Sequence, residues 1–397
     1  MKTTIFIIIY ILFFTSCFGF KYFPSKGISA IYIVIIVYGI ITGFRYKFVF
    51  RKQLLLFLIF IICNIISCYF IREQSIIGTL AVETNIMAIL LTFLLVKYKM
   101  NIHRIEIALS FLSVFFCIVY AIQNFMYPIS IYTEINTDLI KVTEETSARL
   151  RFTGQGIGSL GYFMFINKYF ETRNKKNILL ALICFSFLIL MAFRTMIIAA
   201  LIGTLYLYSK YYTISLKNIL KITLSLTSIF IISYVILPQF HDKIFFLFDR
   251  FTEISELDRS YIRFITLDYY YNNFFINPLE YIFGAGFPNF KESGKYAFQI
   301  QENINSGIFW DDWGLLGLSW ILGPIPVILL VIISIKAIKL KVDRKYKYFA
   351  AWYIFLLLIS CLNTEFFRTG NPSIHALVLY CLILANRIYE NRNRYVS

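Results

Sequence analysis

The sequence predicts an all-α, polytopic membrane protein with about twelve transmembrane helices. Hydrophobic residues make up 59% of its 397 residues, including 42 Phe and 29 Tyr. A soluble domain could not bury that much apolar surface. A membrane-spanning helix needs about 20 mostly apolar residues, and the chain contains repeated runs of about that length. They lie near residues 4–20, 28–44, 53–71, 76–96, 105–126, 156–170, 178–193, 196–209, 220–238, 313–335, 348–363 and 373–388.

The positions of the basic residues predict how these spans are oriented. Loops on the cytoplasmic side of a membrane carry an excess of Lys and Arg, and here every second loop is basic. Those loops and the two ends of the chain hold most of the 38 Lys and Arg, but only Glu171, Asp343 and Glu390 among the 22 acids. We therefore expect both termini in the cytoplasm. The first run lacks a small-residue cleavage site and is expected to be a span, not a cleaved signal.

The net charge of +16 is explained by this topology and by attraction to anionic lipid, so no nucleic-acid partner is expected. The seven cysteines fall within apolar runs, where small apolar packing is the expected role. His103, His241 and His375 are scattered along the chain. The sequence therefore predicts no metal site and no cofactor.

Two loops on the non-cytoplasmic side, 127–155 and 239–312, are too long for simple connections, so the chain is expected to be one membrane domain, 1–397, with two outer loops. Long ordered loops are usually functional, and the many Tyr, Phe and Ile residues here argue against disorder. In the second loop, apolar residues between 262 and 275 predict a helix near the membrane surface. Asn277-Pro278 should end it.

Two pairs of arginines in these loops are candidate anion ligands. Arg259 and Arg263 are four residues apart, so on a helix they share one face and repel each other unless an anion lies between them. Ion pairing with neighbouring acids is an equally good explanation. Arg149 and Arg151 are two residues apart, so in an extended strand they point the same way and can form a clamp. Anchoring at the membrane interface is the alternative.

Arg194 lies between the runs 178–193 and 196–209, and both flanking loops are basic. Helices of these lengths span only ~24 and ~21 Å, against a hydrocarbon core of ~30 Å. The turn should therefore lie below the outer surface, where an arginine is costly unless it is paired or faces a polar cavity. We favour a functional role for Arg194. For Glu83, within the fourth run, hydrogen-bonded packing is favoured over a cation-binding role.

Several of these segments resemble motifs of one protein group. The segments are Arg149-Leu-Arg-Phe-Thr-Gly154, Phe193-Arg194-Thr195, Asp258–Arg263 continuing through Asn277-Pro278 to Gly286, and Asp311-Asp-Trp-Gly314. They resemble motifs of the O-antigen polymerase and O-antigen ligase group of bacterial membrane glycosyltransferases. Phe193 departs from the group's Ser-Arg-Thr element. The ligases also carry a histidine late in the second outer loop, where this chain has Asp311 and Asp312, and this difference favours a polymerase.

The resemblance implies a GT-C-like helical architecture in the bacterial inner (plasma) membrane. It implies a metal-independent polymerase of undecaprenyl-diphosphate-linked repeat units of O-antigen (as in lipopolysaccharide), capsule or a related polysaccharide. Arg149, Arg151, Arg259 and Arg263 would bind the substrate diphosphates, and Arg194 would act in catalysis. Asp311 or Asp312 would serve as the general base. Aromatic residues at 269–271 and 310 would stack on sugars or anchor at the interface.

Two other functions remain as alternatives. One is O-antigen ligase, and the other is a flippase or transporter of lipid-linked oligosaccharides. Transporters are commonly built from internal repeats, but no matching halves are found here, and the polar residues concentrate outside the spans. The expected partners are lipid-linked oligosaccharides and membrane lipids, with a chain-length regulator protein as a further candidate.

Overall fold

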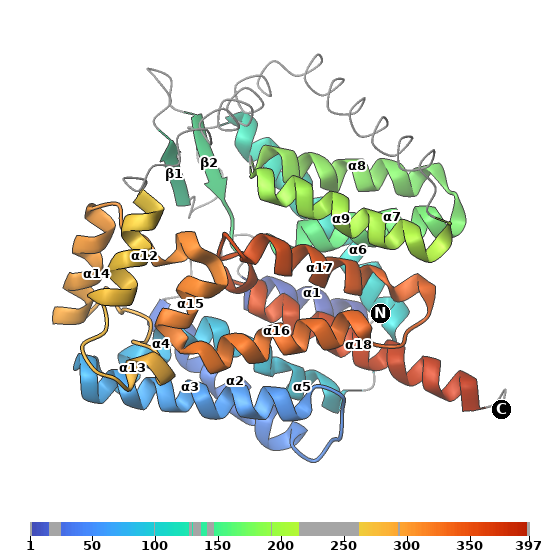
Figure 1. Ribbon diagram of the computed structural model, residues 1–397. Helices are drawn as coiled ribbons and strands as arrows, with labels where there is room; N and C mark the ends of the chain where they lie inside the picture. Colours follow the sequence, from blue (N-terminus) through green and yellow to red (C-terminus); the bar gives the residue numbers. More distant parts are fainter. Residues whose placement is uncertain are drawn as a thin grey trace.

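The computed structural model describes residues 2–15, 25–98, 100–126, 129, 136–140, 147–191, 193–213, 262–292 and 294–394 (Figure 1). These residues are mostly helical, and one short antiparallel hairpin is formed by β1 and β2. The elements, in chain order, are α1 (Lys2–Thr15), α2 (Ser25–Gly43), α3 (Arg51–Arg72), α4 (Ile76–Met87), η1 (Ala88–Leu90), α5 (Leu91–Lys97), α6 (Ile102–Met126), β1 (Asn136–Ile140), β2 (Ser147–Arg151), α7 (Gly156–Thr172), α8 (Lys175–Leu190), α9 (Arg194–Tyr211), α12 (Ile262–Asn272), α13 (Glu280–Phe283), α14 (Lys295–Asn305), η3 (Trp310–Trp313), α15 (Gly314–Leu322), α16 (Pro324–Lys339), η4 (Arg344–Tyr346), α17 (Tyr348–Ser360), η5 (Glu365–Phe367) and α18 (Asn371–Arg394).

The helical fold class is confirmed, and the chain is a membrane protein. Among the described residues, four helical stretches are long and apolar enough to cross a membrane: α3, α6, α18 and the continuous run Ile76–Lys97. Large apolar side chains on α3 and α6 are exposed, as expected for surfaces that face lipid. Every predicted apolar run in the described part of the chain coincides with helix. The run 220–238 lies outside the described residues, and the number of crossings stays a prediction.

Helix α18 lies in the core of the bundle, where it packs against α1, α4, α5, α6 and α7. All residues from 371 to 383 are buried, which requires a helix that is apolar on every face. At Ser373 its polar groups are satisfied by α1: Tyr10 donates a hydrogen bond to the Ser373 carbonyl (3.0 Å), and the Ser373 hydroxyl donates to the Phe14 carbonyl (3.0 Å).

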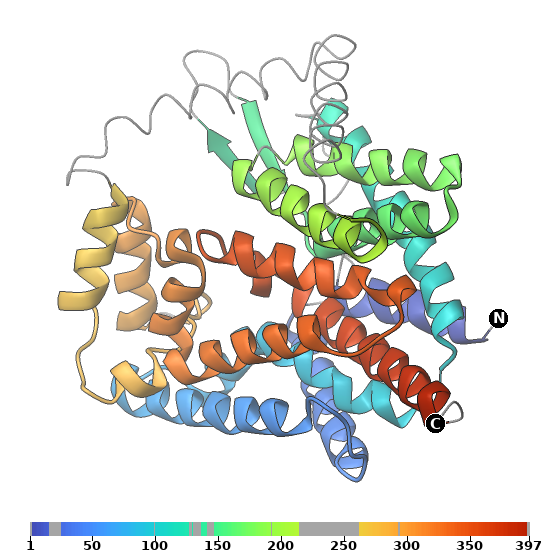
Figure 2. The same cartoon turned by 45° about the vertical axis from the view of Figure 1, so that its right-hand side comes forward.

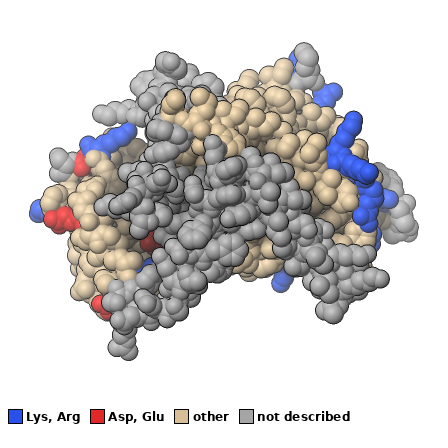
Figure 3. Space-filling view, turned by 90° about the horizontal axis from the view of Figure 1, so that it is seen from above, with Lys and Arg blue, Asp and Glu red and all other residues tan. Residues whose placement is uncertain are grey.

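The bundle has two ends of different character. We call one the basic end, because it carries the turns 44–50, 98–101, 172–175 and 340–347. Helix α1 begins and α18 ends there (Figures 1 and 2). The opposite, distal end carries the hairpin and α12–α14. Seen from above, the largest group of Lys and Arg lies at the basic end and smaller groups lie elsewhere, whereas acidic side chains are visible only toward the distal end (Figure 3).

Two predicted spans differ in detail from the structure. The run 313–335 is divided into α15 and α16 at Gly323, which has a φ of +83° and is followed by Pro324 at the start of α16. Proline lacks the N–H that would continue the helix, so the break follows from the Gly-Pro pair. The run 76–96 is interrupted by the 3₁₀ turn η1. The Cys361 side chain, expected to pack within a span, is exposed just after α17.

Helices α12–α14 form a small distal module that is docked on the bundle by Arg72. This arginine, at the end of α3, is buried and forms an ion pair with the buried Glu280. Its guanidinium also donates to Gln299 (3.0 Å) and to the Phe274 carbonyl (2.7 Å). A buried charge is tolerated only when it is paired and hydrogen-bonded in this way. The pair therefore joins the segment that carries α12–α14 to the bundle.

Candidate functional site

The loop 361–370, between α17 and α18, is the centre of a buried polar cluster at the distal end. Glu365, in η5, is almost fully buried. Its carboxylate accepts hydrogen bonds from the side-chain amides of Gln155 (2.6 Å) and Asn371 (3.0 Å). The Asn371 amide also donates to the Glu365 carbonyl (2.7 Å). These bonds compensate for burying the carboxylate and fix the loop against the starts of α7 and α18.

Arg368 adds a positive charge to the same loop. Its Nε lies 3.1 Å from the Glu365 carboxylate, and its side chain is only 9% exposed. Its Nη2 donates to Asn363 at 3.3 Å. Sequence reasoning missed this arginine. The available signal was the Glu365-Phe-Phe-Arg368 spacing, three residues apart between two apolar runs.

The segment just before α7 contacts this cluster directly. The Gly154 N–H donates to the Thr369 carbonyl at 2.7 Å, and the Gly156 N–H donates to the Asn371 side chain at 2.9 Å. Strand β2 precedes this contact and carries Arg149 and Arg151. They lie opposite Asp138 and Asn136 of β1 in the hairpin register. The segment that carries the two arginines is extended, as the sequence predicted.

The segment η3, with Asp311 and Asp312, packs on the other side of the loop. The Trp310 ring stacks on Phe367, with ring centroids 6.0 Å apart. Gly314, with a φ of +52°, brings the start of α15 against the backbone of Ser360 and Asn363. Both aspartates are half-buried and follow Trp310 directly, so they lie beside the 361–370 loop.

Helix α12 contacts η3 through a hydrogen bond. The Trp313 indole N–H donates to the Arg263 carbonyl at 3.0 Å, so the start of α12 lies next to the segment that carries the two aspartates. The Arg263 side chain is half-buried. Its expected companion, Arg259, lies outside the described residues.

One of the three tyrosines of α12 cannot have the role expected for it. Tyr270 is fully buried, and its ring stacks on Trp320 at 4.5 Å, so it cannot also stack on a sugar or anchor at the membrane interface. Burial, together with the nearby Tyr269 and Asp311, raises the pKa of Tyr270. The Tyr269 hydroxyl accepts hydrogen bonds within the module. Only Tyr271 of the three is exposed.

Arg194 is the first residue of α9, and its side chain is half-buried. Helices α9 and α17 pack side by side and run in opposite directions (Figure 1). The two helices touch at Gly203 of α9 and Ala351 of α17, where a Cβ added to Gly203 would lie 3.2 Å from the Ala351 carbonyl oxygen. Arg194 precedes Gly203 by nine residues and Ser360 follows Ala351 by nine, so both lie about 14 Å from that contact toward the distal end. Arg194 is therefore at the same depth as the start of the 361–370 loop.

Two polar residues of α4 complete the surroundings of the loop. The Asn85 side chain donates to the Phe367 carbonyl (2.9 Å) and accepts from the Gly370 N–H (3.0 Å). Glu83 is fully buried beside the backbone of Phe287 and forms no ion pair with a residue that the structure describes. Its role stays open between packing and cation binding.

Comparison of the chain with models of protein families and with curated proteins finds no match. In the described ranges, no group of three or more His, Cys, Asp or Glu side chains is arranged to hold a metal ion. The polar cluster therefore carries the structural information on function. One ion pair, two aspartates and the segments that carry four of the predicted arginines lie together at one end of the helical bundle.

Proposed function

We propose that the chain polymerises oligosaccharide repeat units linked to undecaprenyl diphosphate, for O-antigen, capsule or a related surface polysaccharide. One observation supports this proposal above the others. Three motif segments that are far apart in the sequence meet around the 361–370 loop. Gly154 is hydrogen-bonded to Thr369 of the loop, and η3 stacks on its Phe367. The segment with Arg263 contacts η3 through Trp313. The segments that suggested a diphosphate chemistry are thus neighbours in space.

The chemistry of these residues suits a diphosphate substrate. Arginine stays charged at every physiological pH and binds phosphate through two parallel hydrogen bonds. Fixed cations help most where charge develops on the leaving group. We assign Arg149, Arg151 and Arg263, with Arg259, to the diphosphates, and Arg194 to the reacting end. Arg368 adds a charge whose position is fixed by Glu365.

The proposed reaction is a glycosyl transfer. A sugar hydroxyl of the incoming lipid-linked unit attacks the anomeric carbon of the growing glycan. Its proton passes to Asp311 or Asp312, acting as general base. The bond from that carbon to the carrier diphosphate breaks, and undecaprenyl diphosphate leaves with the electron pair. The product is a glycan one unit longer on the incoming carrier.

The location of this reaction forms part of the proposal. The basic end is assigned to the cytoplasm and the distal end to the outer face of the bacterial inner membrane, with both termini cytoplasmic. About twelve crossings in a GT-C-like bundle are proposed. Cysteine substitutions at two exposed positions test this orientation: Ser306, just after α14, and Lys52, at the start of α3. In a background without the exposed native Cys361, an impermeant thiol reagent applied to intact spheroplasts should label Ser306→Cys and not Lys52→Cys; the reverse would overturn the assignment.

Deletion of the gene tests the reaction class. Loss of a polymerase should leave the lipid carrier or the cell surface with single repeat units in place of long chains. Repeat units that accumulate on the cytoplasmic leaflet would instead identify a flippase. Long polymer that stays on its carrier would identify a ligase. Complementation should restore long chains with the wild-type gene.

A further inference from the structure

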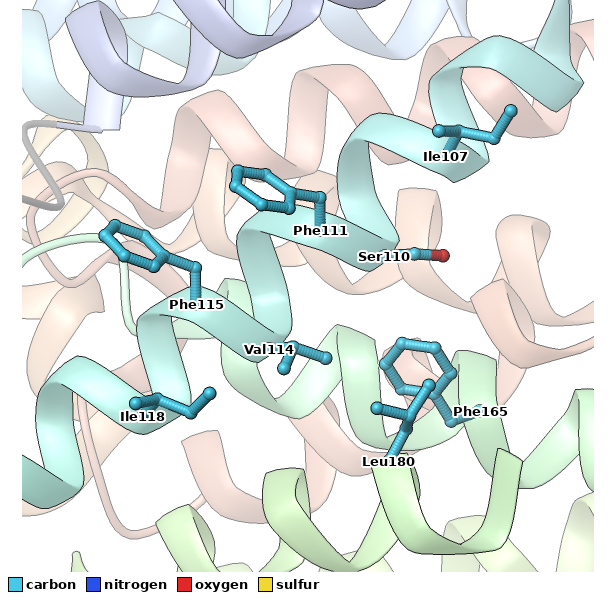
Figure 4. A pocket seen from close by; sticks show the side chains of 8 residues that line it. All are labelled: Ile107, Ser110, Phe111, Val114, Phe115, Ile118, Phe165 and Leu180. Carbon is cyan, nitrogen blue, oxygen red and sulfur yellow. The ribbon is translucent and has the colours of Figure 1, made fainter. Parts of the chain in front are cut away.

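A groove on the lipid-facing side of α6 is a second candidate binding site, remote from the 361–370 loop. It has a volume of about 470 Å³, within the ~300–1,000 Å³ range of ligand sites. Figure 4 shows residues of α6 along one side, with Phe165 of α7 and Leu180 of α8 facing them. The lining residues on α6 are Ile107, Ser110, Phe111, Val114, Phe115 and Ile118.

The groove has the dimensions of one leaflet. Its residues on α6 recur every three or four positions, so they form one stripe along the helix. From Ile107 to Ile118 this stripe is ~16 Å long at ~1.5 Å per residue, about half of a ~30 Å hydrocarbon core. Phe111 is 61% exposed, so the groove is open to the membrane. An acyl chain from one leaflet would fill it from end to end.

The groove is lined mainly by apolar side chains, and two cations of the described chain lie at one end of it. Lys168 reaches across from α7, and its Nζ donates to the Ser110 hydroxyl at 3.4 Å. Arg104 is exposed on α6, one turn before Ile107 and on the same face,. Two acids lie near this end. Glu106 is buried, accepts a hydrogen bond from Tyr348 (2.8 Å) and lies within electrostatic range of Lys168, and Glu171 is exposed near the end of α7.

We propose that this groove binds one anionic phospholipid from the leaflet at the basic end. The phosphate would lie between Arg104 and Lys168, and an acyl chain would run along Phe111 and Phe115 toward the bilayer centre. Charge complementarity selects this occupant, because Arg104 and Lys168 lie at the end of the groove where a leaflet head group would be. The site is at the opposite end from the proposed glycosyl transfer and does not depend on it.

Titration of the full-length protein in zwitterionic detergent micelles, followed by native mass spectrometry, tests this site. We expect one molecule of phosphatidylglycerol to bind more tightly than phosphatidylcholine. A cation near an anionic head group contributes enough for about a five-fold effect. Arg104→Gln and Lys168→Gln should therefore each weaken phosphatidylglycerol binding about five-fold, and the double variant about thirty-fold. Val114→Trp, which fills the groove, should abolish binding of that one molecule.

Lys52→Gln is the matched control, because it removes an exposed cation at the basic end on α3 and should leave binding unchanged. Equal affinity for the two phospholipids would overturn the proposal. So would an equal loss of binding in Lys52→Gln and Lys168→Gln, which would indicate only general charge attraction. A dimer that dissociates on Val114→Trp substitution would show that a second copy of the chain occupies the groove, and this too would refute it.

Discussion

Removal of the Arg72 guanidinium should release the distal module from the bundle. The side chain is 2% exposed, forms an ion pair with Glu280, and donates to Gln299 and to the Phe274 carbonyl. The rings of Phe274 and Tyr296 lie 4.8 and 4.9 Å from its guanidinium carbon. Arg72→Met keeps most of the side-chain volume but removes all these polar and cation–π interactions.

The loss of stability depends on the Glu280 carboxylate, which the substitution leaves without its ion-pair partner. In Arg72→Met, the Glu280 carboxylate stays buried with the backbone N–H groups of Ile276 (2.8 Å) and Asn277 (3.4 Å) as its donors. Breaking a buried ion pair by removing one partner costs about 3–5 kcal/mol. Glu280→Gln removes the stranded charge and keeps an oxygen for those backbone donors. The double variant should therefore be more stable than Arg72→Met alone.

Cys68 is a natural probe for opening of the module. It is 1% exposed on α3 and packs under Gly286, where a Cβ would come within 2.6 Å of its sulfur. When opening and closing are fast, the labelling rate follows the population of the open state. A loss of 3–5 kcal/mol corresponds to an increase of roughly 150- to 5,000-fold in that rate. Peptide mass spectrometry can follow Cys68, with the exposed Cys361 as internal reference.

Lys295→Met is the matched control, because it removes an exposed cation from α14 of the same module. A surface substitution of this kind should change stability by less than about 0.5 kcal/mol. If Arg72→Met labels Cys68 no faster than Lys295→Met does, the ion pair does not dock the module. If Glu280→Gln fails to slow labelling in the Arg72→Met background, the stranded charge is not the source of the loss.

Three further predictions concern the distal end. Gly314→Ala should lower stability by about 2 kcal/mol or more in thermal unfolding, because φ is +52° and a Cβ would collide with the backbone carbonyl at the end of α17. Gly294→Ala, where an added Cβ meets nothing within 4 Å, should be tolerated in the same measurement. Arg194→Lys and Arg194→Ala should both abolish long chains on polysaccharide gels while the protein accumulates, because the point charge of a lysine cannot form the two parallel hydrogen bonds of a planar guanidinium. Full-length polymer from Arg194→Ala would show that the residue only anchors the helix at the membrane interface. Either Asp311→Asn or Asp312→Asn removes the base, and that variant should slow turnover about 10²- to 10⁴-fold. Near-normal rates from both variants would leave the reaction without an identified base.

The apolar runs predicted the helix positions well because a long apolar run has few other stable conformations in a membrane. The division at Gly323-Pro324 was readable from the same sequence, since both residues interrupt a helix. The β1 partner of the arginine strand was not predicted. Its sequence, Asn136 to Ile140, has little of the alternation that marks a half-buried strand.

The site was only partly predictable, because its connections are long-range. The segment before Gly154 was found from its arginines, and the segment at Asp311 from its resemblance to the motifs of the polymerase and ligase group. The loop that joins them was missed, because Glu365 and Arg368 look like ordinary loop charges until their partners are known. Gln155 lies 210 residues from Glu365 in the sequence. No local pattern reports a contact of that separation.

Chain extension by the purified protein in liposomes is the most direct test of the central claim. Given lipid-linked repeat units, the wild-type protein should produce a ladder of longer glycans and release one undecaprenyl diphosphate for each unit added. Arg263→Lys should lower the yield of the ladder, because a lysine cannot form the two-bond contact to phosphate. A preparation that keeps Cys68 protected, and is therefore folded, yet extends no glycan would contradict the claim.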